Sequence, residues 1–258
     1  MKITGLIDVL KRNTTLNLYL AYNYPSLFKL KQGKIVRWKK HLLLSDAMQE
    51  LALFDLIVLK EIYSIPECCV KRGDIVFDIG AHLGFFSYHA KLKGAEMIYA
   101  FEPNPYACEI LKKHAQLWNI VNLIVHDCAL HSEKGDLELF IPKNHLASVS
   151  TTVQNRHETV LEKFEYTEKI VVKAITLDDF VHENRIERVD FIKIDVEGSE
   201  KEVIEGAEKT IKKFKPKMAI AAYHRPNDKK AIPELVLSIR DDYRFKLVNK
   251  GEEDLFFY

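Results

Sequence analysis

Val76 to Gly84 read V-F-D-I-G-A-H-L-G, and this stretch decides the fold class. A short apolar run ends in Asp78, glycines follow at positions 80 and 84, and an amphipathic run begins at Phe85. The pattern predicts a strand, a tight turn and the start of a helix. Glycines let a backbone come close to a ligand, and the first turn of a helix offers free N–H donors. We therefore expect a ligand at this turn.

A second apolar run, Met97 to Phe101, ends in Glu102. An acid after the second strand, about twenty residues beyond such a turn, can accept hydrogen bonds from both hydroxyls of a ribose. The two runs together predict a nucleoside-containing cofactor across the carboxyl ends of two parallel strands.

The spacing also indicates which cofactor this is. A dinucleotide fingerprint would need glycine at positions 82 and 85, where this chain has His82 and Phe85, and their side chains would obstruct a pyrophosphate. No Gly-Lys-Ser/Thr follows a glycine-rich loop, so a Walker motif is absent. Asp-x-Gly-x-x-x-Gly, with an acid after the next strand, resembles the first two motifs of class I S-adenosylmethionine-dependent methyltransferases. That cofactor has a ribose and an amino acid but no phosphate, and the turn supplies an acid for its amino group.

Composition is compatible with an ordinary globular enzyme. The chain has 258 residues, 47% of them hydrophobic, and a net charge of +1, so the protein as a whole is not a polyanion binder. The charge is uneven, since residues 1–72 hold twelve Lys/Arg and six Asp/Glu. The four cysteines form no C-x-x-C pair, which is typical of reduced thiols. No secretory signal pattern opens the sequence, and no apolar stretch near the start is long enough to span a bilayer. We expect a cytoplasmic protein without a membrane span.

From Asp74 onward, strand patterns alternate with helix patterns, which predicts a parallel sheet covered on both faces. The predicted strands are Asp74–Asp78, Met97–Phe101, Asn122–His126, Val189–Ile194 and Lys217–Ala222. The predicted helices are Phe85–Lys93, Pro105–Trp118, Glu200–Lys213 and Ala231–Ile239. Two last strands, Phe245–Val248 and Leu255–Tyr258, should form an antiparallel hairpin. The expected fold is therefore an α/β class I methyltransferase, Rossmann-like fold, with a mostly parallel seven-stranded sheet.

Two segments lie outside this alternation. Residues 1–70 form an N-terminal extension, with a small hairpin at Phe28–Trp38 and a helix near Asp46–Ile62, and could cap the substrate. Residues 71–258 form the methyltransferase domain. Within it, residues 142–169 are a polar insertion between strand-like runs at Leu137–Ile141 and Ile170–Ala174. Such a loop can be a lid or substrate selector, or a surface excursion, and the sequence leaves both readings open.

Val189 to Glu200 read V-D-F-I-K-I-D-V-E-G-S-E, an apolar strand that ends in Asp195. Together with V-F-D-I-G-A-H-L-G, F-E-P-N-P at 101–105 and T-L-D-D at 176–179, this resembles the FkbM family of methyltransferases over roughly residues 60–258. The resemblance implies methyl transfer from S-adenosylmethionine to an oxygen, typically a hydroxyl of a sugar or polyketide-like acceptor. It implies that the cofactor contacts are Asp78, Gly80, Ala81, Gly84, Glu102 and Asp127. It implies that Asp195, Glu197 and Glu200 line the reaction side.

Methylating an alcohol requires alignment with the sulfonium carbon and removal of a proton. His224 follows the fifth strand on the reaction side, and an imidazole titrates near neutral pH, so we predict it as the base. His82 and His126 are rivals on the cofactor side. Asp195 could instead be the base, or could bind a divalent ion with Glu197 or Glu200. Those two glutamates could equally serve only the helix dipole, and no metal site is assigned.

Two other functions remain as alternatives. The basic stretch from Lys29 to His41 could serve a nucleic-acid methyltransferase, although a charged surface is the commoner explanation. The chain could also be a cofactor-binding module without catalysis. The acceptor and the oligomeric state do not follow from the sequence.

Overall fold

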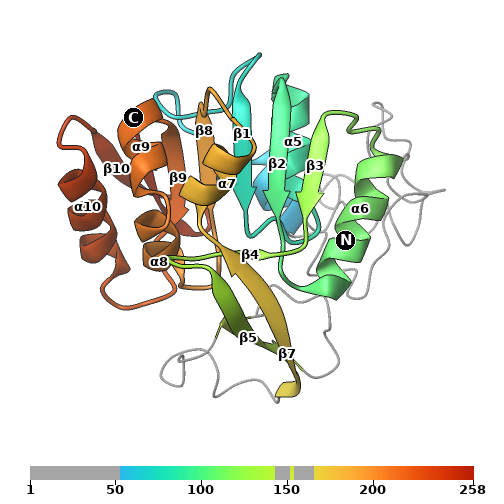
Figure 1. Cartoon of the computed structure of the whole chain (residues 1–258). Helices are drawn as coiled ribbons and strands as arrows, with labels where there is room; N and C mark the ends of the chain where they lie inside the picture. The colour runs from blue at the N-terminus through green and yellow to red at the C-terminus, as the bar shows by residue number, and fades with distance from the viewer. Residues whose placement is uncertain (1–52, 143–151, 154–165) are drawn as a thin grey trace, which may run out of the picture.

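The computed structural model describes residues 53–142, 152–153 and 166–258 (Figure 1). Its main sheet has seven strands in the order β10-β11-β9-β8-β1-β2-β3. Neighbours from β9 to β3 pair in parallel, while β11 is antiparallel to both β9 and β10. The predicted class I methyltransferase fold and its terminal hairpin are confirmed. The strands are β1 Ile75–Ile79, β2 Met97–Phe101, β3 Leu123–His126, β8 Phe191–Ile194, β9 Lys217–Ala221, β10 Phe245–Asn249 and β11 Glu253–Phe257.

Successive residues of a strand point to opposite faces of the sheet, and the central strands carry apolar residues on both faces. Helices therefore cover both faces. In β1, Phe77 packs into a core with α7, α8, α9 and α10, while its neighbour Val76 packs into a second core with α5. The π-helix η1 lies against α5 on this second side. The helices are η1 Asp55–Leu59, α5 Phe85–Lys93, α6 Pro105–Leu117, α7 Leu177–Glu183, α8 Glu200–Glu205, α9 Glu208–Phe214 and α10 Asp228–Ile239.

One predicted helix is wrong in its extent. The sequence predicts a single helix from Glu200 to Lys213, and the structure has two, α8 and α9, separated at Gly206. A Cβ on Gly206 would lie 2.0 Å from the carbonyl oxygen of His131, so the chain passes close to another backbone here. The carboxylate of Asp178 accepts hydrogen bonds from the backbone N–H of Lys209 and Thr210. This side chain satisfies the free donors at the start of α9 and favours a new helix there.

A second sheet lies beyond the carboxyl ends of the central strands (Figure 1). It has four strands in the order β4-β7-β5-β6. The strand-like runs predicted on either side of the polar insertion belong to β5 and β7, which pair antiparallel, but the sequence did not predict that they form a sheet. Residues 143–151 and 154–165 of the insertion lie outside the described residues. The strands are β4 Ala129–Leu130, β5 Gly135–Pro142, β6 Thr152–Val153 and β7 Tyr166–Ile175.

The predicted N-terminal extension is described only from residue 53. Its hairpin at Phe28–Trp38 and residues 46–52 of the predicted helix lie outside the described residues, and the described part of that helix ends with η1 at Leu59. Phe54, Ile62 and Tyr63 are buried in the two cores on the α5 side of the sheet. The boundary at residue 70 stays a prediction. Within the described ranges, none of the helices has the length and apolar character needed to cross a bilayer.

Candidate active site

The turn between β1 and α5 is packed against the end of β8. Gly80 has a φ of +74°, and a Cβ there would lie 1.9 Å from the carbonyl oxygen of Asp195. The backbone N–H groups of Gly80 and Ala81 both donate to the carbonyl oxygen of Phe101, at the end of β2. The turn is therefore fixed between two neighbouring strand ends, and it needs glycine because the backbone of Asp195 fills the space of a side chain.

Asp78 and Gly84, both predicted to contact the cofactor, pack against the protein interior next to this turn. Asp78 is fully buried, accepts a hydrogen bond from Ser87 Oγ at 2.7 Å and lies 3.5 Å from Lys193 Nζ. Lys193 Nζ also donates to the carbonyl oxygen of Gly80 at 2.6 Å. Gly84, with a φ of +84°, precedes α5 and packs against Leu111. Neither Asp78 nor Gly84 borders the two hollows described below, and the contact between Asp78 and the cofactor's amino group stays a prediction.

Glu102 lies where the ribose-binding acid was predicted. Its Oε2 accepts from the backbone N–H of His82 at 2.7 Å, and its Oε1 accepts from that of Asn104 at 2.9 Å. Each carboxylate oxygen keeps a further lone pair for a ligand hydroxyl. Burial raises the pKa of Glu102 to about 7, although the two hydrogen bonds oppose that rise.

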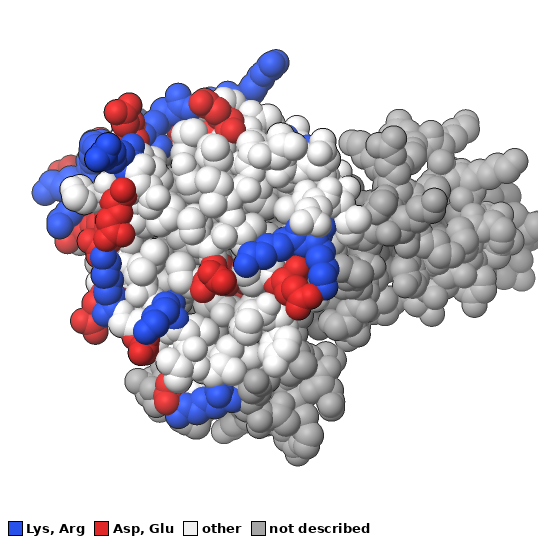
Figure 2. Space-filling model, turned by 45° about the vertical axis from the view of Figure 1, so that its right-hand side comes forward, with Lys and Arg blue, Asp and Glu red and all other residues white. Residues whose placement is uncertain are grey.

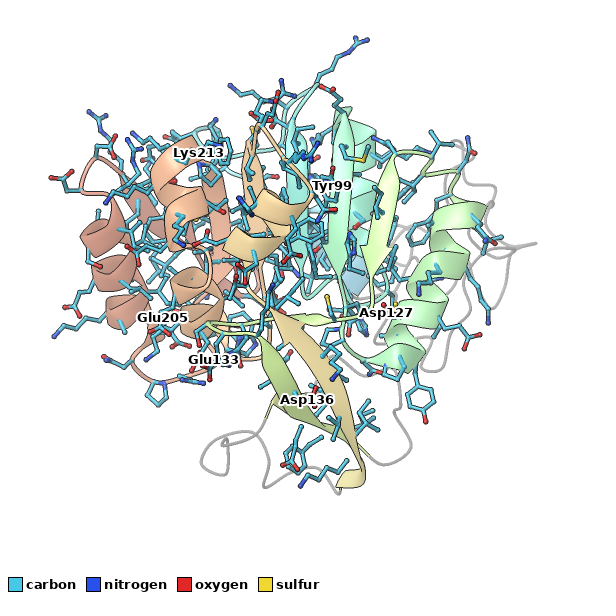
Figure 3. The ribbon with its side chains drawn as sticks, viewed as in Figure 1. Tyr99, Asp127, Glu133, Asp136, Glu205 and Lys213 are labelled. Atoms are coloured by element: carbon cyan, nitrogen blue, oxygen red, sulfur yellow. The ribbon has the colours of Figure 1, made fainter. Side chains whose placement is uncertain are left out.

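A first hollow opens beside Glu102, under the second sheet. It is lined by residues from β1, β2, β4, β5 and the loop after β8, among them Glu102, Pro103, Cys128, Leu130 and Leu139. Asp127 was predicted near the adenine, but its side chain is 78% exposed, lies 3.8 Å from Lys112 and does not line this hollow. Figure 3 shows Asp127 just beyond β3, next to the start of β4. Cys128, which the sequence analysis missed, borders the hollow instead.

A second hollow lies on the other side of the turn. Its lining combines aromatic and ionisable side chains, among them Tyr63, Phe85, Lys193, Tyr223, His224 and Glu252. Gly80, His82, Asp195 and Glu197 line both hollows. The two hollows therefore meet at these four residues, and Asp195 and Glu197 are the ionisable acids at the junction.

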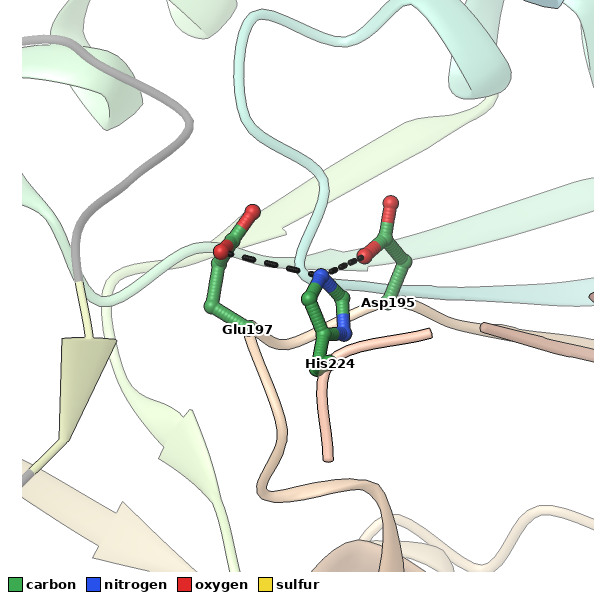
Figure 4. A group of neighbouring side chains, drawn as sticks. All are labelled: Asp195, Glu197 and His224. Atoms are coloured by element: carbon green, nitrogen blue, oxygen red, sulfur yellow. Dashed lines mark ion pairs between the residues drawn. The ribbon is translucent and has the colours of Figure 1, made fainter. Parts of the chain in front are cut away.

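Asp195, Glu197 and His224 form a cluster at this junction (Figure 4). His224 Nε2 lies 3.7 Å from Asp195 Oδ1 and 3.6 Å from Glu197 Oε2. Asp195 is the residue after β8, Glu197 follows in a left-handed conformation with a φ of +56°, and His224 comes from the loop after β9. Adjacent parallel strands thus bring residues of distant sequence position to one edge of the sheet, as predicted.

Buried neighbours form hydrogen bonds with Asp195 Oδ2 and His224 Nδ1, the atoms of these side chains that point away from the centre of the cluster. Tyr63 Oη donates to Asp195 Oδ2 at 2.6 Å, and Glu200 Oε1 lies 3.0 Å from His224 Nδ1. Glu200 Oε1 also accepts from the backbone N–H of Val196 and Gly198. Glu200 was predicted to line the reaction side. It is instead 1% exposed and lies behind His224, because these hydrogen bonds turn its carboxylate inward.

The acidic surroundings change the titration expected for His224. Burial by itself would lower the pKa of this imidazole, but the hydrogen bonds and charges of Glu197 and Glu200 raise it to about 11. The near-neutral pKa that we predicted for a base is therefore wrong for this protein without ligands. The charge of His224 in turn lowers the pKa of Glu200, against the effect of burial.

The rival histidines occupy different positions. His82 lines both hollows and has a φ of +49°. His126 lines neither and stacks on the ring of Phe101 at 4.9 Å, and burial lowers its pKa. Tyr63, Tyr223 and Glu252 were missed, because nothing in their local sequence marks them. Only the polar loop of the terminal hairpin hinted at Glu252.

Comparison with known proteins identifies the family. The model of the methyltransferase FkbM domain matches residues 78–247, which is well over half of the chain. The chain belongs to the FkbM methyltransferase family. A crystal structure of a methyltransferase FkbM from Methylobacillus flagellatus KT has a TM-score of 0.53 and 23% sequence identity. That match covers 72% of this chain and 44% of the other, and it supports the fold.

Similar curated proteins carry related names. Methyltransferase sdnD of Sordaria araneosa is 30% identical, and the match covers 54% of this chain and 62% of that protein. The 31-O-demethyl-FK506 methyltransferase FkbM of Streptomyces tacrolimicus is 28% identical over 54% of this chain and 61% of its own length. The hexuronic acid methyltransferase AglP of Haloferax volcanii is 23% identical, and the match covers 71% of this chain and 70% of that protein. This chain thus spans less than two thirds of the length of the first two.

Proposed function

We propose that this protein is an S-adenosylmethionine-dependent O-methyltransferase that acts on a hydroxyl of a small molecule or glycan. The observation that carries the proposal is the meeting of two hollows at Asp195 and Glu197. One hollow contains the buried carboxylate of Glu102 and the other contains aromatic and acidic side chains. Methyl transfer needs a donor site and an acceptor site that share a junction.

The first hollow suits the donor. Glu102 can accept hydrogen bonds from ribose hydroxyls, and Pro103, Cys128 and Leu139 offer apolar surface to an adenine. Three carboxylates line this hollow, those of Glu102, Asp195 and Glu197, and its lining includes neither Lys nor Arg, so it suits a sulfonium cation better than a phosphate. Gly80 brings the backbone of the turn within reach of the amino acid part of the cofactor.

The second hollow suits the acceptor. The exposed ring of Tyr223 can stack on a sugar or a macrocycle, while Glu252 can bind hydroxyls. An acceptor hydroxyl placed at the junction would receive the methyl group from the sulfonium, and its proton would leave to the Asp195–Glu197–His224 cluster. The names of the relatives fit this assignment, since one indicates an oxygen as the methylation site and another a hexuronic acid.

A transfer assay tests the proposal. The protein is incubated with cofactor labelled in its methyl group and with fractionated extract or panels of sugars and polyhydroxylated products, and methylated molecules are identified. We predict that Asp195→Asn lowers turnover by about 10²-fold or more, the scale of acid–base catalysis, while the affinity for S-adenosylhomocysteine changes little. Glu205→Gln, on the exposed side of α8, is the matched control and should behave as the wild type. Label on nitrogen or carbon atoms alone, or a fully active Asp195→Asn, would contradict the proposal.

A nucleic-acid acceptor has less support. The second hollow presents Asp195, Glu197 and Glu252, while its Lys193 is already engaged by backbone carbonyls and Asp78. Phosphate would be repelled there. In Figure 2, basic and acidic side chains are interspersed on the face that is shown. The basic segment from Lys29 to His41 lies outside the described residues. Salt-sensitive RNA binding together with RNA methylation would favour this alternative, and cofactor binding without any transfer would favour a silent module.

A further inference from the structure

We propose that Asp195, Glu197 and His224 bind one divalent transition-metal ion at the junction of the two hollows. Each offers a ligand atom, and these atoms all lie within 4.8 Å of one another. The three side chains converge from the loops after β8 and β9 (Figure 4). A cluster of acids alone would not indicate a metal site, but the buried atoms Asp195 Oδ1 and His224 Nε2 add a second observation.

Two buried atoms in the cluster make only long ion-pair contacts, without a hydrogen bond of normal length. These are Asp195 Oδ1 and His224 Nε2, and the side chain of His224 is only 4% exposed. Buried polar atoms nearly always have a hydrogen bond of normal length, whereas His224 Nε2 lies 3.7 Å from Asp195 Oδ1 and 3.6 Å from Glu197 Oε2. A cation between them would satisfy both atoms.

The second polar atom of Asp195 and that of His224 each have a hydrogen-bond partner on the side away from the cluster. Tyr63 donates to Asp195 Oδ2, and Glu200 pairs with His224 Nδ1. A carboxylate on one ring nitrogen points the other nitrogen forward, which is the usual support of a metal-binding histidine, and an ion that binds there would displace the proton on Nε2. Tyr63 and Glu200, which are themselves buried, thus orient Asp195 Oδ1 and His224 Nε2 toward each other.

The spacing fits an ion after a small inward movement. With metal–ligand bonds of about 2.1 Å, ligand atoms lie roughly 3.0 Å apart in octahedral and 3.4 Å apart in tetrahedral coordination. His224 Nε2 is 3.7 Å from Asp195 Oδ1 and 3.6 Å from Glu197 Oε2. These two distances need to shorten by about 0.2–0.7 Å, and the two carboxylate oxygens, which lie within 4.8 Å of each other, would also have to approach each other.

The donor set indicates the kind of ion. Mg²⁺ and Ca²⁺ prefer oxygen ligands throughout, whereas an imidazole with two carboxylates suits Mn²⁺, Fe²⁺ or Zn²⁺. Three protein ligands leave positions open for another oxygen. If the proposed function holds, that oxygen is the acceptor hydroxyl, whose pKa the ion would lower in readiness for methylation. This role rests on the proposed function, but the binding of the ion does not.

Direct binding of Mn²⁺ tests the site without cofactor or acceptor. The full chain is freed of metal with a chelator and titrated with MnCl₂, and free Mn²⁺ is followed by electron paramagnetic resonance. We expect one ion per chain, competition by Zn²⁺, and affinity at least tenfold lower in Asp195→Asn and His224→Gln. Glu205→Gln, which removes an exposed acid on α8 and no proposed ligand, should keep the wild-type affinity. Binding of S-adenosylhomocysteine shows that each variant is folded.

Two results would overturn the proposal. One is the absence of stoichiometric Mn²⁺ or Zn²⁺ binding by the folded wild type. The other is binding that both ligand variants leave unchanged, which would place the ion elsewhere. A protein that binds the ion but methylates no hydroxyl would keep this site and refute the proposed function, so the two failures are distinguishable.

Discussion

At the scale of single residues, Asp195 connects most of the candidate site. Its backbone N–H donates to Ile79 of β1, and its carbonyl oxygen lies where a side chain of Gly80 would be. Its carboxylate accepts from Tyr63, which is 132 residues away in the sequence. Asp195 therefore contacts the β1–α5 turn, the N-terminal segment and His224. This explains why it lines both hollows.

Glu102 should make cofactor binding depend on pH. Burial raises its pKa to about 7, so the group is ionised above that pH and becomes protonated below it. Only the ionised form offers both oxygens to ribose hydroxyls, so affinity should be full at high pH and decline as the pH falls through 7. We expect S-adenosylhomocysteine to bind about tenfold more weakly at pH 6 than at pH 8, as measured by calorimetry.

The control is Glu102→Gln, which keeps the size of the side chain but removes the charge. The amino group of the ligand titrates in the same way with the wild type and with the variant. The ratio of the two affinities at each pH therefore reports only the ionisation of Glu102. We expect this variant to bind more weakly at pH 8 by roughly 1–3 kcal/mol and to approach the wild type at pH 6. A ratio that is constant over this range would contradict the assignment of Glu102 to the ribose.

At the scale of elements, the β1–α5 turn depends on one close backbone contact. We predict that Gly80→Ala lowers the free energy of unfolding by at least about 2 kcal/mol more than Gly73→Ala does. Both glycines have positive φ, at +74° and +88°, so both variants carry the strain of a left-handed alanine, about 1–2 kcal/mol. A Cβ at Gly73 has nothing within 4 Å, whereas one at Gly80 would collide with Asp195. Urea unfolding measures both, and equal losses would mean that the contact yields easily.

At the scale of the whole molecule, the two hollows should bind their ligands separately. Glu102 lines only the first and Tyr223 only the second. Glu102→Ala should weaken cofactor binding, and Tyr223→Ala should raise the KM of the acceptor without changing cofactor affinity. Because the two side chains share no partner, their effects on kcat/KM should add within about 0.5 kcal/mol in the double variant. A larger coupling energy would show that cofactor and acceptor share one continuous site.

The sequence predicted the central strands and the positions of Gly80, Glu102, Asp195 and His224 well, because each depends on a local pattern. Apolar runs with acids at their ends predict strands, and adjacent parallel strands bring those ends together. It was less informative about Asp78, which is turned inside by Ser87 and Lys193, and about Asp127, which faces solvent. Local spacing cannot show which way a side chain is held once distant partners compete for it.

The sequence by itself determined the fold class, the β1–α5 turn and the edge of the sheet where the candidate site lies. The tertiary structure alone decided that Tyr63 reaches Asp195, that Glu200 lies behind His224, and that these contacts leave two buried atoms facing each other. It also decided the protonation of His224, whose pKa is set by acids around it and not by the imidazole itself. The physical reason is that a strand or a turn depends on neighbours in the chain. Hydrogen bonding and ionisation depend on every group that packing brings near.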